Sequence, residues 1–275
     1  MVPISWLEAV VLGLVQGITE FLPVSSSAHI FVVSQLLGWQ DPGAAFTAVS
    51  QIGTELAVIV YFRRDIARII SAWARSLVKP ALRSSIDARM GWYIIIGTIP
   101  IAVLGLVFSH QIETAARNLW LVSGTLILFG IILGVADALG RHQLAISNLN
   151  AKDGILFGLG QALALIPGVS RSGATISTGL ALGYTREASA RYAFLLAIPA
   201  VVASGLYEAT RISSDPVVAW GPTILATVIA FISGFAVIAW LLRWVTTRTY
   251  LPFVIYRIVL GVLLIVLLMT GVLVA

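Results

Sequence analysis

The stretch "GLVQGITEFLPVSSSA" at residues 13–28 aligns without a gap with "GLGQALALIPGVSRSG" at residues 158–173, which lies 145 positions later. Each copy belongs to an apolar region, 4–37 or 154–184, that Pro, Gly and Ser interrupt in the middle. We interpret each region as two short helices joined by a non-helical tip, and the pair as an internal repeat. The identical positions are Gly13/Gly158, Leu14/Leu159, Gln16/Gln161, Val24/Val169, Ser25/Ser170 and Ser27/Ser172.

The composition predicts an integral membrane protein. Hydrophobic residues make up 59% of the 275 positions, charged residues 11%, and the mean hydropathy is +0.99, values far from those of soluble domains. The apolar runs are long enough for helices that cross a bilayer, and no ten-residue alternation suggests a barrel. The fold class is therefore all-α. The absence of cysteine excludes disulfides, thiolate metal sites and cysteine nucleophiles.

The distribution of basic residues predicts the topology. Seven of them lie in the loop 63–89, which the positive-inside rule assigns to the cytoplasm. In a membrane chain the net charge of +5 reflects topology, so we expect no nucleic-acid partner. The first charged residue is Glu8, so a basic signal region is missing, and we expect the N-terminus to remain in the mature protein. Six apolar runs are predicted spans: about 44–62, 91–108, 118–139, 192–207, 221–242 and 253–274.

The repeat and the charges together predict two re-entrant hairpins. Each half, about 1–140 and 150–275, contains one interrupted region followed by three spans, so the second half is inverted relative to the first within one membrane domain, 1–275. For the loop charges to agree, each interrupted region must return to the side from which it entered. We expect the two polar tips to meet near the bilayer midplane and to line a cavity.

The first tip combines an acid, serines and a histidine. Gln16 and Glu20 are four residues apart and share a helix face, and Pro23 ends that helix. Ser26 and His29 are three apart on the first turn of the next helix. A helix N-terminus disfavours a protonated imidazole, so His29 is expected to accept a proton from Ser26, as a base does from a nucleophile.

The second tip, "IPGVSRSGAT" at residues 166–175, predicts a phosphate site. Arg171 offers a planar fork of donors that suits phosphate, and an arginine at this depth needs an acid or an anionic ligand. Converging helix N-termini also favour an anion. With Glu20 from the first tip, the site could hold Mg²⁺ or Ca²⁺, which prefer oxygen ligands.

The stretches "VQGITEFLPVSSSAH" (15–29) and "PGVSRSGAT" (167–175) resemble the two signature motifs of the bacitracin-resistance family of undecaprenyl-diphosphate phosphatases, and the similarity covers essentially the whole chain. The resemblance implies an enzyme of the bacterial inner membrane that removes one phosphate from a polyprenyl diphosphate lipid on the outer side. This reaction recycles the lipid carrier of cell-wall synthesis. The family's fold has six spans and two inverted re-entrant hairpins, and it is often a homodimer.

The resemblance also implies roles for individual residues. Glu20 and Gln16 bind the metal or the diphosphate, where some members have a second Glu at the position of Gln16. Ser26 and His29 carry the chemical step, together with Glu20 and Arg171. The expected contacts to the diphosphate come from both tips: Gln16, Ser25, Ser27, Gly168, Ser170, Ser172, Gly173 and Thr175.

Several alternatives stay open at this point. Ser25–Ser27 could be a helix N-cap cluster, Glu20 could pair with Arg171 without a metal, and Glu55 is interpreted as a structural or cavity-lining group. The nucleophile could be Ser26 or a metal-bound water. A secondary transporter or lipid-phosphate flippase is the rival function, because inverted repeats with broken helices are typical of carriers.

Overall fold

The structure is a computed structural model that describes residues 4–40, 43–109, 111–112, 118–212 and 219–273. The described part consists of helices joined by turns and loops and contains no strands, apart from one isolated bridge between Leu144 and Tyr184. Five of its helices are long and apolar enough to cross a membrane, so the chain is an all-α membrane protein. They are α5 (Ile86–Val107), α7 (Leu119–Leu139), α10 (Arg186–Ile212, of which Arg186–Gly205 qualifies), α11 (Trp220–Thr247) and α12 (Leu251–Met269).

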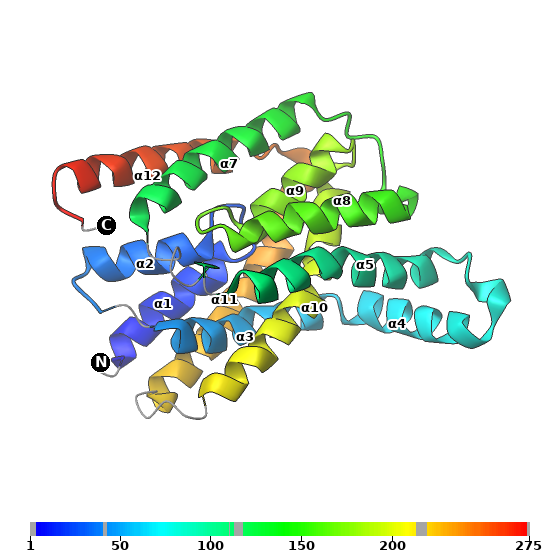
Figure 1. Cartoon of the computed structure of the whole chain (residues 1–275), viewed down its shortest axis with the longest axis horizontal. Helices are drawn as coiled ribbons and strands as arrows, with labels where there is room; N and C mark the ends of the chain where they lie inside the picture. The colour runs from blue at the N-terminus through cyan, green and yellow to red at the C-terminus, as the bar shows by residue number, and fades with distance from the viewer. Residues whose placement is uncertain (1–3, 41–42, 110, 113–117, 213–218, 274–275) are drawn as a thin grey trace.

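The two interrupted regions form helical hairpins. The first consists of α1 (Trp6–Thr19) and α2 (Ser26–Leu36), and the second of α8 (Ala151–Ala162), the 3₁₀ turn η3 (Leu163–Leu165) and α9 (Arg171–Ala181). In both, the two helices pack against each other and the tip contains a proline. Proline has no backbone N–H to donate and crowds the preceding turn, which disfavours a continuous helix through each tip. The long helices α5 and α10 nevertheless accommodate Pro100 and Pro199. Figure 1 shows α1 and α2 on the left of the molecule and α8 and α9 nearer its middle.

The hairpins are held by close helix–helix contacts. Helix α1 packs on α11, and α8 packs on α5. At Gly13 a Cβ atom would lie 2.7 Å from the Ala226 carbonyl oxygen, and at Gly158 it would lie 2.2 Å from the Gly97 carbonyl oxygen. Glycine is therefore required at both positions for the backbones to approach this closely.

The remaining helices complete the bundle around the hairpins. Helix α3 (Gly43–Tyr61) lies between α11 and α10, and α7 pairs with α12 along the opposite side. In α3, the described apolar stretch Phe46–Tyr61 is shorter than the five long spans. The two termini lie at the same end of the molecule (Figure 1).

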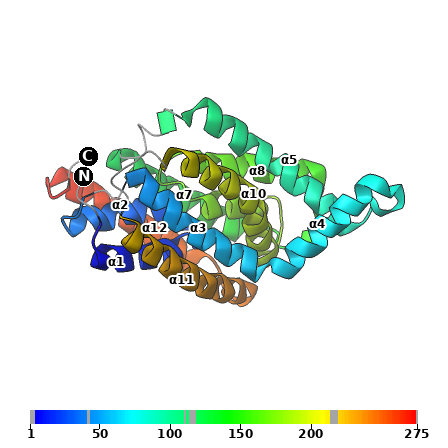
Figure 2. The same ribbon diagram turned by 90° about the horizontal axis from the view of Figure 1, so that it is seen from below.

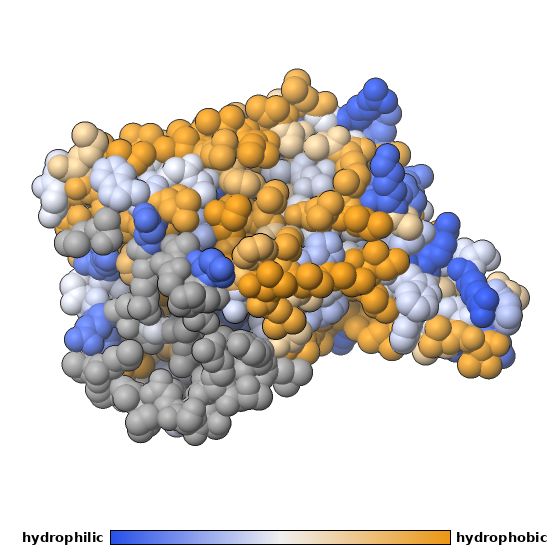
Figure 3. Space-filling model, viewed as in Figure 1, coloured by the Kyte–Doolittle hydropathy of each residue, from blue (hydrophilic) through white to orange (hydrophobic). Residues whose placement is uncertain are grey.

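The basic segment 63–89, expected as a loop, contains the helix α4 (Arg63–Val78) and the 3₁₀ turn η1 (Pro80–Leu82). Helix α4 packs against α5, and the pair extends beyond the bundle at the end opposite the termini (Figure 2). Apolar residues such as Ile69 alternate with arginines at helical spacing, which makes the helix amphipathic. Figure 3 shows hydrophilic side chains gathered at this end and apolar side chains over α5, α7 and α8.

Candidate active site

Both hairpin tips contain a serine with an unusual backbone conformation. Ser25 has a φ of 75° and Ser170 a φ of 70°. Residues with a side chain rarely adopt such angles, and each instance costs about 1–3 kcal/mol that the surrounding structure must supply. Ser25 and Ser170 are aligned positions of the repeat, and each directly precedes the first residue of a helix, Ser26 of α2 and Arg171 of α9.

Arg171 binds two carboxylates in the interior. Its Nη2 atom donates to Oε1 of Glu20 at 2.8 Å and to Oε1 of Glu55 at 2.7 Å. The side chains are 15%, 6% and 5% exposed for Arg171, Glu20 and Glu55. Glu20 comes from the first tip, Arg171 from the second and Glu55 from α3, so three separate segments form one charged centre.

The second oxygen atom of Glu20 binds the first tip. Its Oε2 atom accepts a hydrogen bond from Ser26 Oγ at 2.5 Å and one from Gln16 Nε2 at 3.0 Å. Gln51 of α3 reaches Glu20 Oε1 at 3.5 Å, a longer contact. The Glu20 carboxylate therefore connects the serine, the arginine and two amides, and it is positioned to take the proton of Ser26.

His29 has other partners than the expected one. Its Nδ1 atom lies 2.7 Å from the Ser25 carbonyl oxygen, and its Nε2 atom lies 2.6 Å from the Tyr256 hydroxyl. Because a carbonyl only accepts, Nδ1 carries the hydrogen, and in a neutral ring Nε2 accepts from Tyr256. The two rings are stacked. Both ring nitrogens are thus occupied, and Ser26 donates to Glu20 instead of His29.

The other predicted residues of the tips bind mainly to protein atoms. Ser172 Oγ donates to the Leu22 carbonyl at 3.0 Å and so joins the two tips. Ser170 Oγ accepts from the Gly173 amide at 3.2 Å and caps α9. Thr175 is fully buried and donates to the Arg171 carbonyl at 2.7 Å. Ser25 Oγ and Ser27 Oγ are 3.4 Å apart.

The predicted glycines of the second tip provide space for neighbouring side chains. Gly168 has a φ of 86°, and a Cβ atom there would lie 2.2 Å from Thr125 Oγ1. A Cβ atom at Gly173 would lie 2.9 Å from Arg257 Nη1. Their positions thus explain tight packing of the tip against α7 and α12.

Sequence reasoning missed two residues of this centre as contributors. Glu55 pairs directly with Arg171, and Tyr256 orients His29. The signal for Glu55 was an acid within an apolar span, spaced four residues from Gln51. Tyr256 gave no signal, since tyrosine is common near membrane surfaces. Arg257 of α12, to which sequence reasoning gave no role in the site, is fully buried.

Three side chains of the centre carry oxygen atoms that a divalent cation could use. Within the described residues, Gln16 Oε1 and Glu55 Oε2 are buried without a hydrogen-bond partner. Together with Glu20 they form a set of hard oxygen donors of the kind that Mg²⁺ and Ca²⁺ bind alongside phosphate oxygens. Among the described residues no group of three His, Cys, Asp or Glu side chains could hold a metal. A cation here would therefore need oxygens from a ligand as well.

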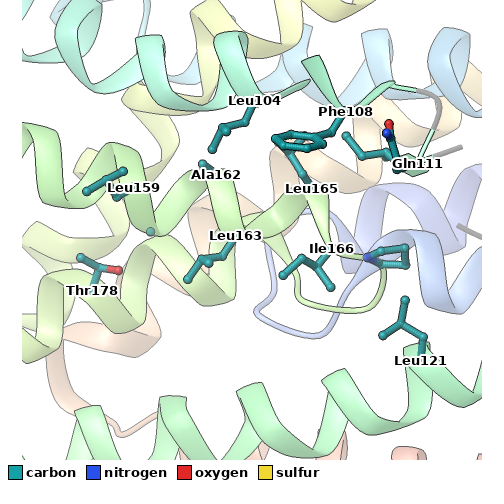
Figure 4. A pocket seen from close by; sticks show the side chains of 13 residues that line it. Leu104, Phe108, Gln111, Leu121, Leu159, Ala162, Leu163, Leu165, Ile166 and Thr178 are labelled. Atoms are coloured by element: carbon teal, nitrogen blue, oxygen red, sulfur yellow. The ribbon is translucent and has the colours of Figure 1, made fainter. Parts of the chain in front are cut away.

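An apolar groove of about 630 Å³ lies beside the second tip. It is lined by Leu104 of α5 and Phe108 directly after that helix, by Leu159 of α8 and Leu163 of η3, and by Ile166 and Pro167 of the tip itself (Figure 4). Leu163 and Phe108 are more than two-fifths exposed. The groove thus borders the loop that leads into Arg171.

The sequence matches a family model described as "Bacitracin resistance protein BacA" over residues 9–263. A curated relative from a Nocardioides species, named undecaprenyl-diphosphatase, is 58% identical over 273 residues, which cover 99% of this chain and 100% of the relative. The protein named undecaprenyl-diphosphatase 2 of Streptomyces avermitilis is 57% identical, covering 97% of this chain and 96% of the relative. The undecaprenyl-diphosphatase of Thermobifida fusca is 56% identical, covering 98% and 92%.

Proposed function

The chain belongs to the bacitracin resistance protein BacA family, and from this premise we propose that its two tips form the active site of an undecaprenyl-diphosphatase. The enzyme removes the terminal phosphate of a C55 isoprenyl diphosphate and leaves the lipid monophosphate. The observation that carries this assignment is that one carboxylate, Glu20, binds both a serine hydroxyl and a buried guanidinium. Such a constellation offers a nucleophile, an acceptor for its proton and a phosphate-binding cation.

The hydrogen bond between Ser26 and Glu20 supports an in-line attack by the serine. Ser26 Oγ bonds to the terminal phosphorus while the bond from that phosphorus to the bridging oxygen breaks. The hydroxyl proton passes to Glu20, and the lipid monophosphate leaves with the bridging oxygen. Water then hydrolyses the phosphoserine. Arg171 and the N-termini of α2 and α9 stabilise the charge that develops on the phosphoryl oxygens.

The formal charges of the centre favour a cation-dependent reaction. One guanidinium faces two carboxylates, so an anionic diphosphate would meet excess negative charge. We propose that Glu20, Glu55 and Gln16 hold Mg²⁺ or Ca²⁺ together with the diphosphate. Such an ion supplies neutralisation of the phosphate charge when bound. Arg171 is then released in part to donate to the phosphates, which its planar fork suits.

His29 acts in this proposal as a brace for the first tip. Its Nδ1 hydrogen bond to the Ser25 carbonyl stabilises the residue with the positive φ angle. Tyr256 fixes the ring from the other side. This role differs from the expected proton transfer between Ser26 and His29, because the carboxylate is the group within reach of the serine hydroxyl.

We propose that the chain crosses the bacterial inner membrane six times, with two re-entrant hairpins and an inverted repeat. Equivalent packing in the two halves supports this arrangement. In the proposed repeat the two hairpins correspond, and α3, α5 and α7 correspond to α10, α11 and α12. The contact of α1 with α11 is then equivalent to the contact of α8 with α5. The contact of α3 with α11 is likewise equivalent to that of α10 with α5. The basic end at α4 is then cytoplasmic, and the site opens to the outer side.

We assign the groove beside the second tip to the isoprenyl tail. Its walls are apolar, its lining residues Leu163 and Phe108 are partly exposed, and Ile166 and Pro167 join it to the loop that leads into Arg171. A lipid whose diphosphate binds Arg171 needs an apolar path for its first isoprene units.

The rival function is transport of a lipid phosphate or another anion, which the inverted repeat alone would also fit. A carrier needs no serine bound to a carboxylate. The purified protein in detergent, where no second compartment exists, separates the two. We expect release of inorganic phosphate from C55 diphosphate and a phosphoserine at Ser26 in acid-quenched samples. Absence of phosphate release by folded protein would favour the carrier.

A further inference from the structure

Arg257 of α12 is fully buried, and its hydrogen-bond partners among the described residues are backbone oxygens. Its Nη1 atom donates to the Pro23 carbonyl at 3.0 Å, and its Nη2 atom donates to the Gly168 carbonyl at 3.1 Å and the Val169 carbonyl at 3.0 Å. Longer contacts from its Nε and Nη2 atoms reach the carbonyls of Leu126 and Thr125 on α7. One side chain therefore contacts both hairpin tips and a neighbouring span.

The carbonyls that Arg257 binds occupy equivalent positions in the two tips. Pro23 and Gly168 are aligned residues of the repeat, 145 positions apart, and they lie two residues before Ser25 and Ser170. The two arms of a single planar guanidinium thus bind the same carbonyl of each tip. The fork of donors has the geometry for two acceptors side by side, which an ammonium group lacks.

Burying the guanidinium charge of Arg257 costs free energy unless hydrogen bonds replace its lost hydration. No carboxylate pairs with Arg257 in the part of the chain that the structure describes. A buried cation without an acid needs several good hydrogen bonds to replace its hydration. The carbonyls of the two tips supply these hydrogen bonds. Arg257 can bind both sets of carbonyls only when the two tips lie against each other.

We propose that Arg257 is the positioning residue that fixes the two tips against each other and so holds Ser26 and Arg171 on the same carboxylate. This inference rests on the proposed function for its catalytic consequence. Arg257 keeps Ser25 and Ser170 in their positive-φ conformations by anchoring the carbonyls that precede them. Arg257 is not among the described hydrogen-bond partners of the Glu20 carboxylate or the Ser26 hydroxyl. We therefore expect it to act through the backbone of the tips.

The test compares three purified full-length variants, Arg257→Met, Arg257→Lys and Leu241→Ala. Leu241 is a fully buried core residue of α11 and serves as the control for general destabilisation. Each variant is measured for kcat and KM with C55 diphosphate, for thermal unfolding in detergent, and for hydrogen exchange of segments 20–28 and 166–173.

We expect Arg257→Met to lower kcat about 100-fold, the loss that a misplacement near 1 Å can cause, and to raise exchange in both tips together. Arg257→Lys should recover part of kcat, because the charge returns but the fork does not. Leu241→Ala should lower the unfolding temperature without raising exchange selectively in the tips. A folded Arg257→Met protein with wild-type kcat, or with unchanged exchange in either tip, would overturn the proposal.

The exchange measurement also separates this inference from the proposed function. If the wild-type protein releases no phosphate, the proposed function fails. A selective rise of hydrogen exchange in both tips of Arg257→Met would still support the positioning role of Arg257. If the wild-type protein releases phosphate and Arg257→Met resembles Leu241→Ala in every measurement, the positioning role of Arg257 is wrong and the proposed function stands.

Discussion

Ser26 and Arg171, 145 positions apart in the chain, are bound to the two different oxygen atoms of one carboxylate, that of Glu20. Each is the first residue of a helix that follows a serine with a positive φ angle. The aligned positions therefore carry a serine in the first tip and an arginine in the second. Glu20 has no acidic equivalent, because the aligned residue is Leu165.

The bond between Ser26 and Glu20 predicts that these two residues act as a unit. Glu20→Gln should lower kcat by about 10²–10⁴, the usual loss on removing a general base, and Ser26→Ala should lower it at least as much. The double variant should have a kcat no lower than that of the less active single variant, since the effects of substitutions within one catalytic unit are not additive. Phosphate release from C55 diphosphate provides the measurement.

Glu8→Gln is the matched control, because Glu8 lies on the same helix and only caps its N-terminus. It should retain full activity. Losses that multiply in the Ser26→Ala, Glu20→Gln double variant would mean that the two residues act independently, against the proposed proton transfer.

The contacts of His29 predict different results for two substitutions. Asn can place an N–H group near the position of Nδ1, so His29→Asn should keep the hydrogen bond to the Ser25 carbonyl and much of kcat. His29→Ala should lose it and destabilise the tip by about 1 kcal/mol. Tyr256→Phe should have a smaller effect than His29→Ala. Equal inactivity of folded His29→Asn and His29→Ala would instead assign the imidazole to the chemistry.

Removal of divalent cations should abolish phosphate release. Activity should return with Mg²⁺ or Ca²⁺, because the excess carboxylate charge again has a counter-ion. Glu55→Gln should raise the cation concentration needed for half of the maximal rate by about 10-fold or more. Asp153→Asn, which changes an acid bound to Tyr184 far from Glu20 in the chain, is the control. Full activity in excess chelator would contradict the proposed cation.

The groove predicts a dependence on chain length. Leu163→Trp should fill part of it and raise KM for C55 diphosphate while leaving KM for isopentenyl diphosphate unchanged, because a single isoprene unit is too short to depend on the groove. Ile132→Trp alters an exposed apolar residue of α7 outside the groove and should change neither value. An equal change for both substrates would place the tail elsewhere.

Much of this architecture was predictable from local patterns. Apolar length predicted the five helices that are long and apolar enough to cross a membrane, whereas the sixth run, 44–62, corresponds to α3, whose described apolar stretch is shorter. Proline and serine predicted the two interruptions, because they act on the local backbone. The helix α4 was not predicted, because the basic residues of this segment were used only to assign the topology. Its helical periodicity becomes evident when the spacing of its apolar residues is considered as well.

The site could be predicted only where its chemistry lies within the motifs. Glu20, Ser26 and Arg171 are motif residues, and the structure brings them together. Glu55, Tyr256 and Arg257 come from spans, and their roles depend on how α3 and α12 pack on the tips. Sequence spacing alone cannot give such contacts, and it also paired Ser26 with His29, where the tertiary structure provides a carboxylate.

The most direct test of the central claim is the rate of phosphate release from C55 diphosphate by purified Arg171→Ala, compared with Arg191→Ala. Arg191 pairs with Asp65 on α4 and is the control for loss of an arginine that forms an ion pair elsewhere in the molecule. We predict that Arg171→Ala lowers kcat by at least about 100-fold, as loss of a key charge-stabilising donor does, while Arg191→Ala stays near the wild-type rate. A folded Arg171→Ala protein that releases phosphate as fast as Arg191→Ala would contradict the account.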